Sequence, residues 1–340
     1  MTTIKEIAKK AGVSPGTVSK ALSGRKDVSP ITKRRIRKIA EELGYIPNFI
    51  ARSLVTNKTH TIGLVTPYLG NPALFDRVRG VQNRCISSHY ILITCLNEGE
   101  FKEEAMQIET LLSRKVDGLI ITPSGESEEL RSLIMKIECP VVLMSEMIEG
   151  LDYDFSGEDD YEGGKIATEY LITLGHRDIA YFGNSPDIYS DRCILKGYKD
   201  TLERYAIPYR SKHIFWGNTE KNTLEDNIEK LLSMPEPPTG IICWSDIIAI
   251  GVLNKLESMG KKVPGDISVV GYDNIEMLSL FHIPLTTIGQ PNFLIGQKAV
   301  ELLLERIENR ETKEPARKVI FKPELIVRNS TGPVKSMVEK

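Results

Sequence analysis

The sequence has 340 residues, of which 41% are hydrophobic and 26% are charged. This composition is typical of a globular protein, and the length predicts two or three domains. No apolar run reaches the roughly 20 residues of a membrane-spanning helix, and the N-terminus lacks the apolar core of a signal peptide. We therefore expect a cytoplasmic protein without a membrane partner. The five cysteines are odd in number and never spaced CxxC, which indicates reduced thiols rather than disulfides or a zinc site.

Charge is distributed unevenly along the chain. Residues 1–58 contain 13 Lys and Arg against 4 Asp and Glu, a net charge of +9, whereas residues 59–340 carry a net charge of −11. A solvated surface face is the alternative explanation of a basic segment. A small basic head on a large acidic body nevertheless favours a polyanionic partner for the head.

Three short helices are predicted in the head. Apolar residues recur at helical spacing over 4–11, where Thr3 and Glu6 match a capping box. A Ser-Pro pair suits the start of a helix, because serine caps the free amides and proline fits the first helical position. Such pairs precede two further predicted helices, over 15–22 and 30–43.

The first two predicted helices match a helix-turn-helix. The turn between them contains Gly12, and the second helix of such a motif enters the DNA major groove. The outer face of helix 15–22 carries small polar side chains. A three-helix module that binds protein is the alternative, and the net charge of +9 favours DNA.

The segment TIKEIAKKAGVSPGTVSKALS, residues 3–23, resembles the signature of the lactose/galactose repressor (LacI/GalR) family of bacterial transcription regulators. The resemblance continues through residues 43–48 and 51–54, and ends with Gly-Tyr-Asp-Asn at 271–274 and Leu-Thr-Thr-Ile at 285–288. It therefore extends over essentially the whole chain. It implies a DNA-binding head over 1–46, a hinge helix and linker over 47–60, and an effector-binding and dimerisation body over 61–340.

The resemblance and the outer face of helix 15–22 together predict the residues that meet DNA. They are Thr3, Ser14, Pro15, Gly16, Thr17, Ser19, Lys20, Asn48, Ala51, Arg52 and Leu54. Pro15 and Gly16 stand where relatives often carry base-reading side chains, so base readout is expected from Ser19 and Lys20. Lys20 suits guanine O6 and N7, and a phosphate contact is the alternative.

The stretch 48–55 is helix-compatible but too short to be stable alone in water, and residues 56–60 form a polar linker. The resemblance implies a hinge helix that pairs with its dimer mate in the minor groove. Leu54 would be the apolar wedge between base pairs, and Arg52 would follow the groove or the phosphates. The alternative is that Leu54 packs on the body.

From residue 61 onward, apolar strand runs alternate with amphipathic helices, which predicts parallel α/β sheets. The expected strands form two series, over 62–65, 90–94, 118–121 and 141–144, then over 179–182, 213–216, 240–243 and 267–270. Two such series fit two lobes. The predicted fold class is thus α/β, with a three-helix helix-turn-helix head and a body that the resemblance identifies as similar to two-lobed periplasmic binding proteins.

Ligands of parallel sheets bind beyond the carboxyl ends of the strands. Polar and aromatic residues near these ends give the expected effector contacts, which are Tyr68, Ser145, Trp216, Trp244, Asp246 and Asp273, and the resemblance adds Arg192 of a predicted helix. Family resemblance assigns Asp273 to the effector. For Asp246 the alternative is a helix N-cap, and for the two tryptophans it is packing within or between lobes.

Two positions depart from the family pattern. Ser145 stands where the family often has Asp, and Ile194 stands where it often has Arg. Arg192 could substitute for that arginine, although two helical residues rotate its direction by roughly 200°. If nothing compensates, the site takes a less hydrophilic ligand or is no longer used.

No catalytic motif is found: the chain has no GxSxG, HExxH, P-loop or strand-linked GxGxxG. We therefore expect no enzyme and no cofactor or metal. The sequence predicts a homodimeric repressor that binds a pseudo-palindromic DNA operator and responds to a small effector, a sugar or a derivative. One alternative is a regulator switched by a partner protein. The other is a sugar-binding protein without a role at DNA.

Overall fold

The computed structural model describes residues 2–22, 27–45, 58–67, 71–217, 221–310 and 314–334. Internal contacts divide the chain into two compact units, residues 1–59 and residues 60–340. We call them the head and the body. In the described part of the chain, no helix combines the length and the apolar character that a membrane crossing requires.

The head is a bundle of three helices, α1 (Ile4–Ala11), α2 (Pro15–Leu22) and α3 (Pro30–Glu42). The predicted capping box is confirmed: the Thr3 hydroxyl accepts from the backbone N–H of Glu6, and the Glu6 carboxylate accepts from that of Thr3. Small and branched side chains form a core at the helix crossings, namely Ile7, Ala8, Ala11, Val18, Ala21, Val28, Ile36 and Ala40. The predicted three-helix head is therefore confirmed.

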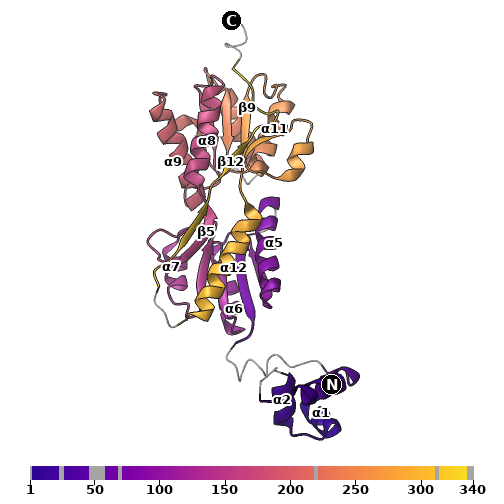
Figure 1. Cartoon of the computed structure of the whole chain (residues 1–340). Helices are drawn as coiled ribbons and strands as arrows, with labels where there is room; N and C mark the ends of the chain where they lie inside the picture. The colour runs from indigo at the N-terminus through magenta and orange to yellow at the C-terminus, as the bar shows by residue number, and fades with distance from the viewer. Residues whose placement is uncertain are drawn as a thin grey trace. The chain divides into compact units, whose positions relative to one another are not determined.

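The body contains two six-stranded sheets, each of which forms one lobe (Figure 1). The first lobe has the strand order β11-β5-β4-β3-β1-β2, and all neighbours in it are parallel. Its strands are β1 (Thr61–Pro67), β2 (Ile91–Asn97), β3 (Gly118–Ile121), β4 (Val141–Met144), β5 (Asp154–Glu158) and β11 (Lys318–Phe321). Its helices are α5 (Pro72–Ser87), α6 (Phe101–Ser113), α7 (Glu128–Ile134) and α12 (Asn292–Glu308).

The second lobe has the order β12-β10-β9-β8-β6-β7, and only β12 is antiparallel to its neighbour. Its strands are β6 (Ile179–Phe182), β7 (Ile214–Phe215), β8 (Gly240–Cys243), β9 (Ser268–Asp273), β10 (Thr286–Gly289) and β12 (Glu324–Ile326). Its helices are α8 (Asp160–Thr173), α9 (Tyr189–Arg204), α10 (Lys221–Leu232) and α11 (Asp246–Ser258), with short 3₁₀ turns η1 (Ser211–His213) and η2 (Glu276–Leu280).

The chain passes between the lobes three times, after β5, after β10 and after β11. Strands β5, β10, β11 and β12, which lie beside these crossings, were not among the predicted strands. The predicted strand 213–216 is shortened, because His213 belongs to a 3₁₀ turn. The prediction of two parallel α/β lobes is confirmed.

Each lobe contains one pair of helices whose backbones touch through glycine. In the second lobe, a Cβ on Gly164 of α8 would lie 2.1 Å from the carbonyl oxygen of Ile194 in α9, and Gly197 of α9 meets Tyr161 of α8 in the same way. In the first lobe, α12 lies beside α5 (Figure 1), where Gly80 and Gly296 make the corresponding contacts. Only glycine permits this closeness.

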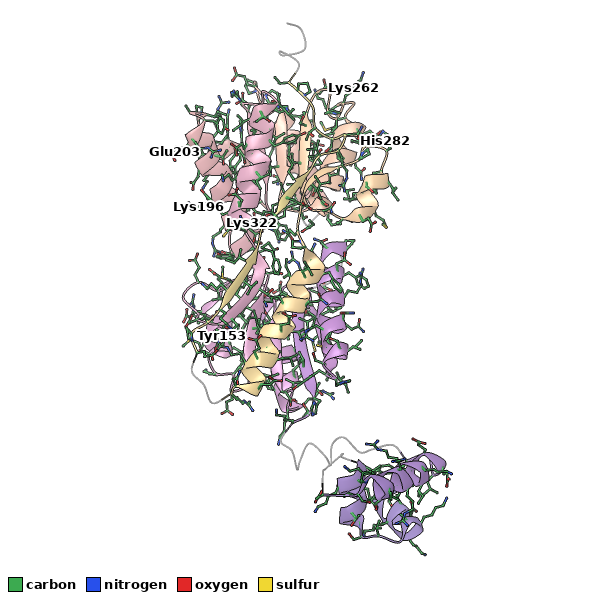
Figure 2. All side chains as sticks on the ribbon, in the orientation of Figure 1. Tyr153, Lys196, Glu203, Lys262, His282 and Lys322 are labelled. Atoms are coloured by element: carbon green, nitrogen blue, oxygen red, sulfur yellow. The ribbon has the colours of Figure 1, made fainter. Side chains whose placement is uncertain are left out.

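The outer side of α9 is solvated. Lys196 and Glu203 point outward from the helix (Figure 2), whereas Ile194 lies within the core of the second lobe. The amphipathic pattern therefore orients α9 so that its apolar face meets α8.

Replacing Gly164 by Ala should destabilise the body by about 1–3 kcal/mol, because the new methyl group overlaps the Ile194 carbonyl and the helices must separate. Urea unfolding followed by tryptophan fluorescence measures this, since both tryptophans, Trp216 and Trp244, lie in the second lobe. Gly265→Ala is the matched control, because its Cβ meets only an ordinary contact at 3.4 Å. Equal stability of the two variants would contradict the close-contact explanation.

Candidate nucleic-acid interface and interlobe site

The outer face of α2 is open to solvent. Pro15, Gly16, Ser19 and Lys20 are exposed, and Thr17 is partly buried. Proline and glycine offer no side-chain hydrogen-bonding group, so the polar reach of this face comes from Ser19 and Lys20. A short helix with this exposed face can enter a major groove.

Two of the predicted DNA contacts also have structural partners. Ser14 Oγ accepts from the backbone N–H of Thr17 at 3.1 Å and lies 2.9 Å from Thr17 Oγ1, so it caps α2. Thr3 caps α1 in the same way. Both hydroxyls contribute to the geometry of the head whether or not they touch DNA.

Lys20 is held by an acidic neighbour. Its Nζ lies 2.6 Å from Asp27 Oδ2, and both side chains are about half exposed. Such a surface pair contributes little to stability. Because the pair is weak and exposed, a DNA base or phosphate can compete with Asp27 for the ammonium group.

The predicted contacts Asn48, Ala51, Arg52 and Leu54 lie outside the described residues, and so does Tyr68. Their expected roles at DNA and effector stay predictions.

The two lobes are joined by side-chain hydrogen bonds at the carboxyl ends of their strands. Glu146, which follows β4, accepts from Ser190 of α9 through both its hydroxyl at 2.5 Å and its backbone N–H at 3.0 Å. The Trp244 indole donates to the same hydroxyl at 3.3 Å. Trp244 therefore holds Ser190 from within the second lobe.

Asp273 ends β9 and faces the first lobe. Its carboxylate accepts from Asn71 Nδ2, at the start of α5, at 2.7 Å. Burial, followed by repulsion from Asp246, raises the pKa of Asp273 to about 8. A carboxyl group that is costly to ionise in this position is typical of a functional site.

An arginine on the apolar stripe of α5 forms the hub of this region. Arg77 is 5% exposed and donates through Nε to Asn292 Oδ1 at 2.6 Å and through Nη2 to Glu158 Oε1 at 2.5 Å. It also donates to Gln290. The predicted site residues did not include Arg77 or Glu158, although a lone arginine among Leu74, Val78 and Val81 at helical spacing was a usable signal.

Asp160, the first residue of α8, completes the group and accepts from the Tyr272 hydroxyl at 3.1 Å. Burial and the neighbouring carboxylates raise the pKa of Asp160 well above its usual range, and burial raises that of Glu146 to about 7. These groups also interact electrostatically with Asp273 and with one another. We call Arg77, Glu146, Glu158, Asp160 and Asp273 the interlobe cluster.

Ser145 and Arg192, two of the predicted effector contacts, differ in their hydrogen bonding. Ser145 is 2% exposed with a φ of 65°, and its Oγ has no hydrogen-bond partner. Arg192 instead pairs with two carboxylates of the first lobe, Glu126 at 2.8 Å and Glu149 at 3.8 Å. Arg192 therefore joins the lobes, while Ile194 is buried in the core of the second lobe.

Asp246 is fully buried, and its neighbour Ser245 is the N-cap of α11, so the alternative of Asp246 as N-cap is wrong. Its carboxylate accepts from Thr287 Oγ1 at 2.6 Å and from the backbone N–H of Ile275 at 2.8 Å. Both of these partners lie in the second lobe, which indicates a structural carboxylate.

Trp216 packs in the core of the second lobe, edge-on to Tyr181 at 6.1 Å between ring centroids. The environment of Trp216 therefore matches the alternative in which this tryptophan packs within a lobe.

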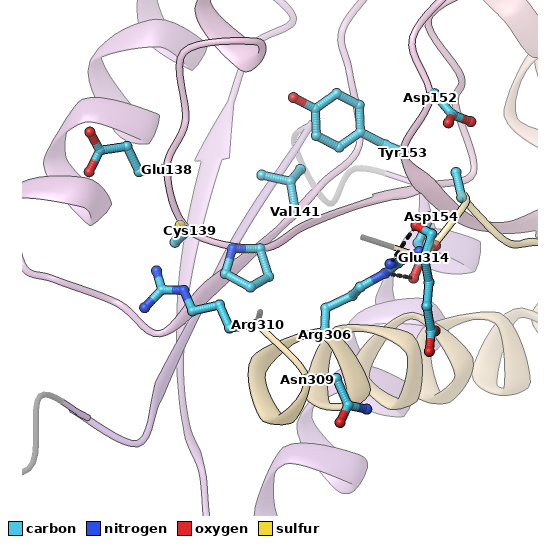
Figure 3. A pocket seen from close by; sticks show the side chains of 12 residues that line it. Glu138, Cys139, Val141, Asp152, Tyr153, Asp154, Arg306, Asn309, Arg310 and Glu314 are labelled. Atoms are coloured by element: carbon cyan, nitrogen blue, oxygen red, sulfur yellow. Dashed lines mark hydrogen bonds and ion pairs between the residues drawn. The ribbon is translucent and has the colours of Figure 1, made fainter. Parts of the chain in front are cut away.

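A pocket of about 270 Å³ lies elsewhere in the first lobe, beside the end of α12 (Figure 3). Asp154 lines it and accepts from Arg306 at 2.7 and 2.9 Å and from Arg317 at 2.8 Å. Although burial opposes ionisation, these hydrogen bonds lower the pKa of Asp154. The arrangement ties β5 to α12 and β11, so its first effect is structural.

Comparison with known proteins decides the family. Residues 3–48 match the model for bacterial regulatory proteins of the lacI family, and residues 168–331 match that of a periplasmic binding protein-like domain. The repressor PurR of Vibrio parahaemolyticus is 35% identical over 331 residues, covering 97% of this chain and 98% of that protein. PurR of Aliivibrio fischeri strain MJ11 is 36% identical over 334 residues, with 97% and 98% covered.

The chain belongs to the lacI family of bacterial regulatory proteins. The lac repressor dimer bound to operator and the anti-inducer ONPF has a TM-score of 0.87 at 25% identity, covering 97% of this chain and 99% of that one. The regulator CelR in complex with cellobiose has a TM-score of 0.73 at 26% identity, with 97% and 100% covered. A lacI-family regulator from Enterococcus faecium with bound ribose has a TM-score of 0.71 at 30% identity, with 81% and 100% covered.

Membership in the lacI family makes this chain a DNA-binding transcription regulator and not an enzyme. The predicted family and function class are therefore confirmed. The head supplies the lacI-family motif, and the two-lobed body supplies the interlobe cluster.

Asp246 makes the stability of the body depend on pH. Burial raises its pKa to about 7 in the folded state, above the roughly 3.9 of an unfolded chain. Its stabilising contribution is therefore complete below about pH 4 and is lost as the pH rises through 7. Asp246→Asn should reduce the fall in unfolding free energy between pH 5 and 8, by up to about 1.4 kcal/mol per pH unit.

Urea unfolding at several pH values measures this difference. Asp76→Asn, which changes an exposed carboxylate of α5, should leave the pH dependence as it is in the wild type. An Asp246→Asn variant with the wild-type pH profile would show that this carboxyl does not titrate in that range.

Proposed function

We propose that this chain is a homodimeric repressor that acts in the cytoplasm without a cofactor. Residues 1–46 bind one half of a pseudo-palindromic operator, residues 47–60 form the hinge, and residues 61–340 bind the effector and dimerise. The effector is a small molecule of the sugar class, bound between the lobes. Binding of the effector changes the angle between the two lobes, and this angle determines whether the hinges of the two protomers can pair.

The observation that carries the proposal is the exposed face of α2, with Ser19 and Lys20 on a basic head of net charge +9. Two such helices, one from each protomer, suit successive major grooves. The interlobe cluster supports a ligand site in the body. The solved relatives with cellobiose and ribose support a sugar as its class.

Exposed apolar side chains on the body support the dimer. Leu280 is 84% exposed on η2, where Met277 is also exposed, and Ile86 and Ile91 are exposed on α5 and β2. Exposed apolar side chains that gather in one place mark interaction sites, and Met277, Leu280 and Phe281 are exposed together at η2. The structural relative crystallised as a lac repressor dimer supports the same assembly.

A regulator switched by a partner protein is the second candidate. The observation that favours it is Ile194, which is buried in the core where the family often has an arginine, while Arg192 is engaged by Glu126. Screening sugars against the full chain separates the two candidates, because only the first predicts a small ligand that changes operator affinity.

Lys20→Ala should weaken binding to the preferred operator by about 1–3 kcal/mol and relax base preference at one position, because a guanine contact is lost. Titration of an operator selected from random DNA, and of its single-base variants, measures both effects. The matched control is Lys10→Ala, which removes a lysine from another exposed ion pair of the head, with Glu42. Weakening that is equal across all sequences would contradict base reading by Lys20.

Leu54→Ala should weaken operator binding, because the bend that the wedge maintains would lose its apolar contact with the central base pairs. Val55→Ala is the control at the neighbouring residue, and it should weaken operator binding less than Leu54→Ala does. Thermal unfolding should show the body unchanged in both variants. Unchanged operator affinity in Leu54→Ala would refute the wedge.

A further inference from the structure

The chemistry of the interlobe cluster narrows the class of effector. We propose, building on the effector-controlled function above, that this cluster binds a ligand that carries a protonated amine beside hydroxyl groups, such as an amino sugar. The same site discriminates against anionic ligands such as sugar phosphates.

The first reason is charge. The cluster places four carboxyl groups, those of Glu146, Glu158, Asp160 and Asp273, around one guanidinium, that of Arg77. Arg77 already donates to Glu158 and to two neutral side chains at the start of α12. An incoming anion would find Arg77 already engaged and would oppose ionisation of the carboxyls, whereas an incoming cation can be balanced when a carboxyl loses its proton.

The second reason is a shortage of hydrogen-bond donors. Glu158 Oε2, Asp160 Oδ2 and Ser145 Oγ are buried and have no hydrogen-bond partner, and each residue is less than one tenth exposed. Buried polar atoms are normally paired. Two of the three are carboxyl oxygens, which accept hydrogen bonds from an ammonium group and from hydroxyls once the carboxyls are ionised.

The third reason is that a metal ion does not fit. Among the described residues, no group of three or more His, Cys, Asp or Glu side chains has the geometry to hold one. The missing positive charge is therefore assigned to an organic ligand, which brings its own shape and hydroxyls.

Binding of an amine should be linked to the protonation of the cluster. Burial raises the pKa of Glu146 to about 7 and that of Asp273 to about 8, and it raises the pKa of Asp160 well above its usual range. Other ionisable groups that act on these carboxyls or lie beside them come from α5, β5, α9, α11 and β9, namely Arg77, Glu158, Tyr189, Arg192, Cys193, Asp246 and Tyr272. A bound ammonium favours the ionised carboxyls, so binding should release protons.

The test compares matched ligands on the full chain. Glucosamine, galactosamine and mannosamine are titrated against glucose, galactose and mannose and against the corresponding hexose 6-phosphates, and binding is followed by the thermal midpoint. At least one amine should bind about tenfold or more tightly than its hexose, and the phosphates should not bind. Calorimetry in two buffers of different ionisation enthalpy should show protons released by that amine.

A variant pair locates the effect. Glu158→Gln should abolish the preference for the amine over the hexose. Glu104→Gln should preserve it, because Glu104 of α6 is also a fully buried carboxyl with one unpaired oxygen but belongs to a separate site with Ser124. A preference that survives in Glu158→Gln would overturn the assignment to the cluster.

A hexose or phosphate that binds as tightly as its amine, or a panel in which no amine binds, overturns the ligand class. Operator titration with the same protein sample separates this failure from failure of the proposed function. If the chain still binds a preferred operator, the regulator stands and only its ligand class is wrong.

Discussion

One buried guanidinium holds together the parts of the body that must meet for a site to exist. Arg77 projects from α5 and reaches Glu158 at the end of β5 and Asn292 at the start of α12. Those two positions border two of the three passages of the chain between the lobes. Because an unpaired buried charge costs about 3–5 kcal/mol, the guanidinium constrains both passages. The interlobe cluster is built around that constraint.

The same region can serve as a switch because polar side-chain contacts join the lobes in the described part of the chain. Glu146 to Ser190, Asn71 to Asp273 and Arg192 to Glu126 each link one lobe to the other. Polar bonds of this kind contribute only about 0.5–1.5 kcal/mol each, so a ligand that replaces some of them can shift the relation of the lobes. β1 begins at Thr61, so such a shift would reach the hinge that we propose over residues 47–60 through the chain itself.

Local rules predicted the head well and the interlobe site only in part. The capping box of Thr3 depends on a few neighbouring residues, and it was predicted. Asp246 was one candidate for the N-cap of α11, but the N-cap is Ser245. The spacing of apolar residues does not determine the start of a helix to within one residue. Arg77 was missed because its role depends on a tertiary partner, Glu158, that is distant in sequence. Strand β5 was missed because its sequence, DFSGE, is too polar to be predicted as a buried strand without its neighbours in the sheet.

The two departures from the family pattern acquire a common physical meaning in the structure. Ile194 belongs to the core of the second lobe, and its carbonyl meets Gly164 of α8. A family arginine is thus absent near a cluster in which the Arg77 guanidinium interacts with four carboxyls. Ser145 removes a carboxylate but leaves an unpaired buried hydroxyl. An arginine exchanged for isoleucine and an aspartate exchanged for serine cancel in net charge, but together they replace the five N–H donors of a guanidinium with one hydroxyl. The site therefore retains its carboxyl acceptors and has fewer donors, which favours a ligand that brings hydrogen-bond donors of its own.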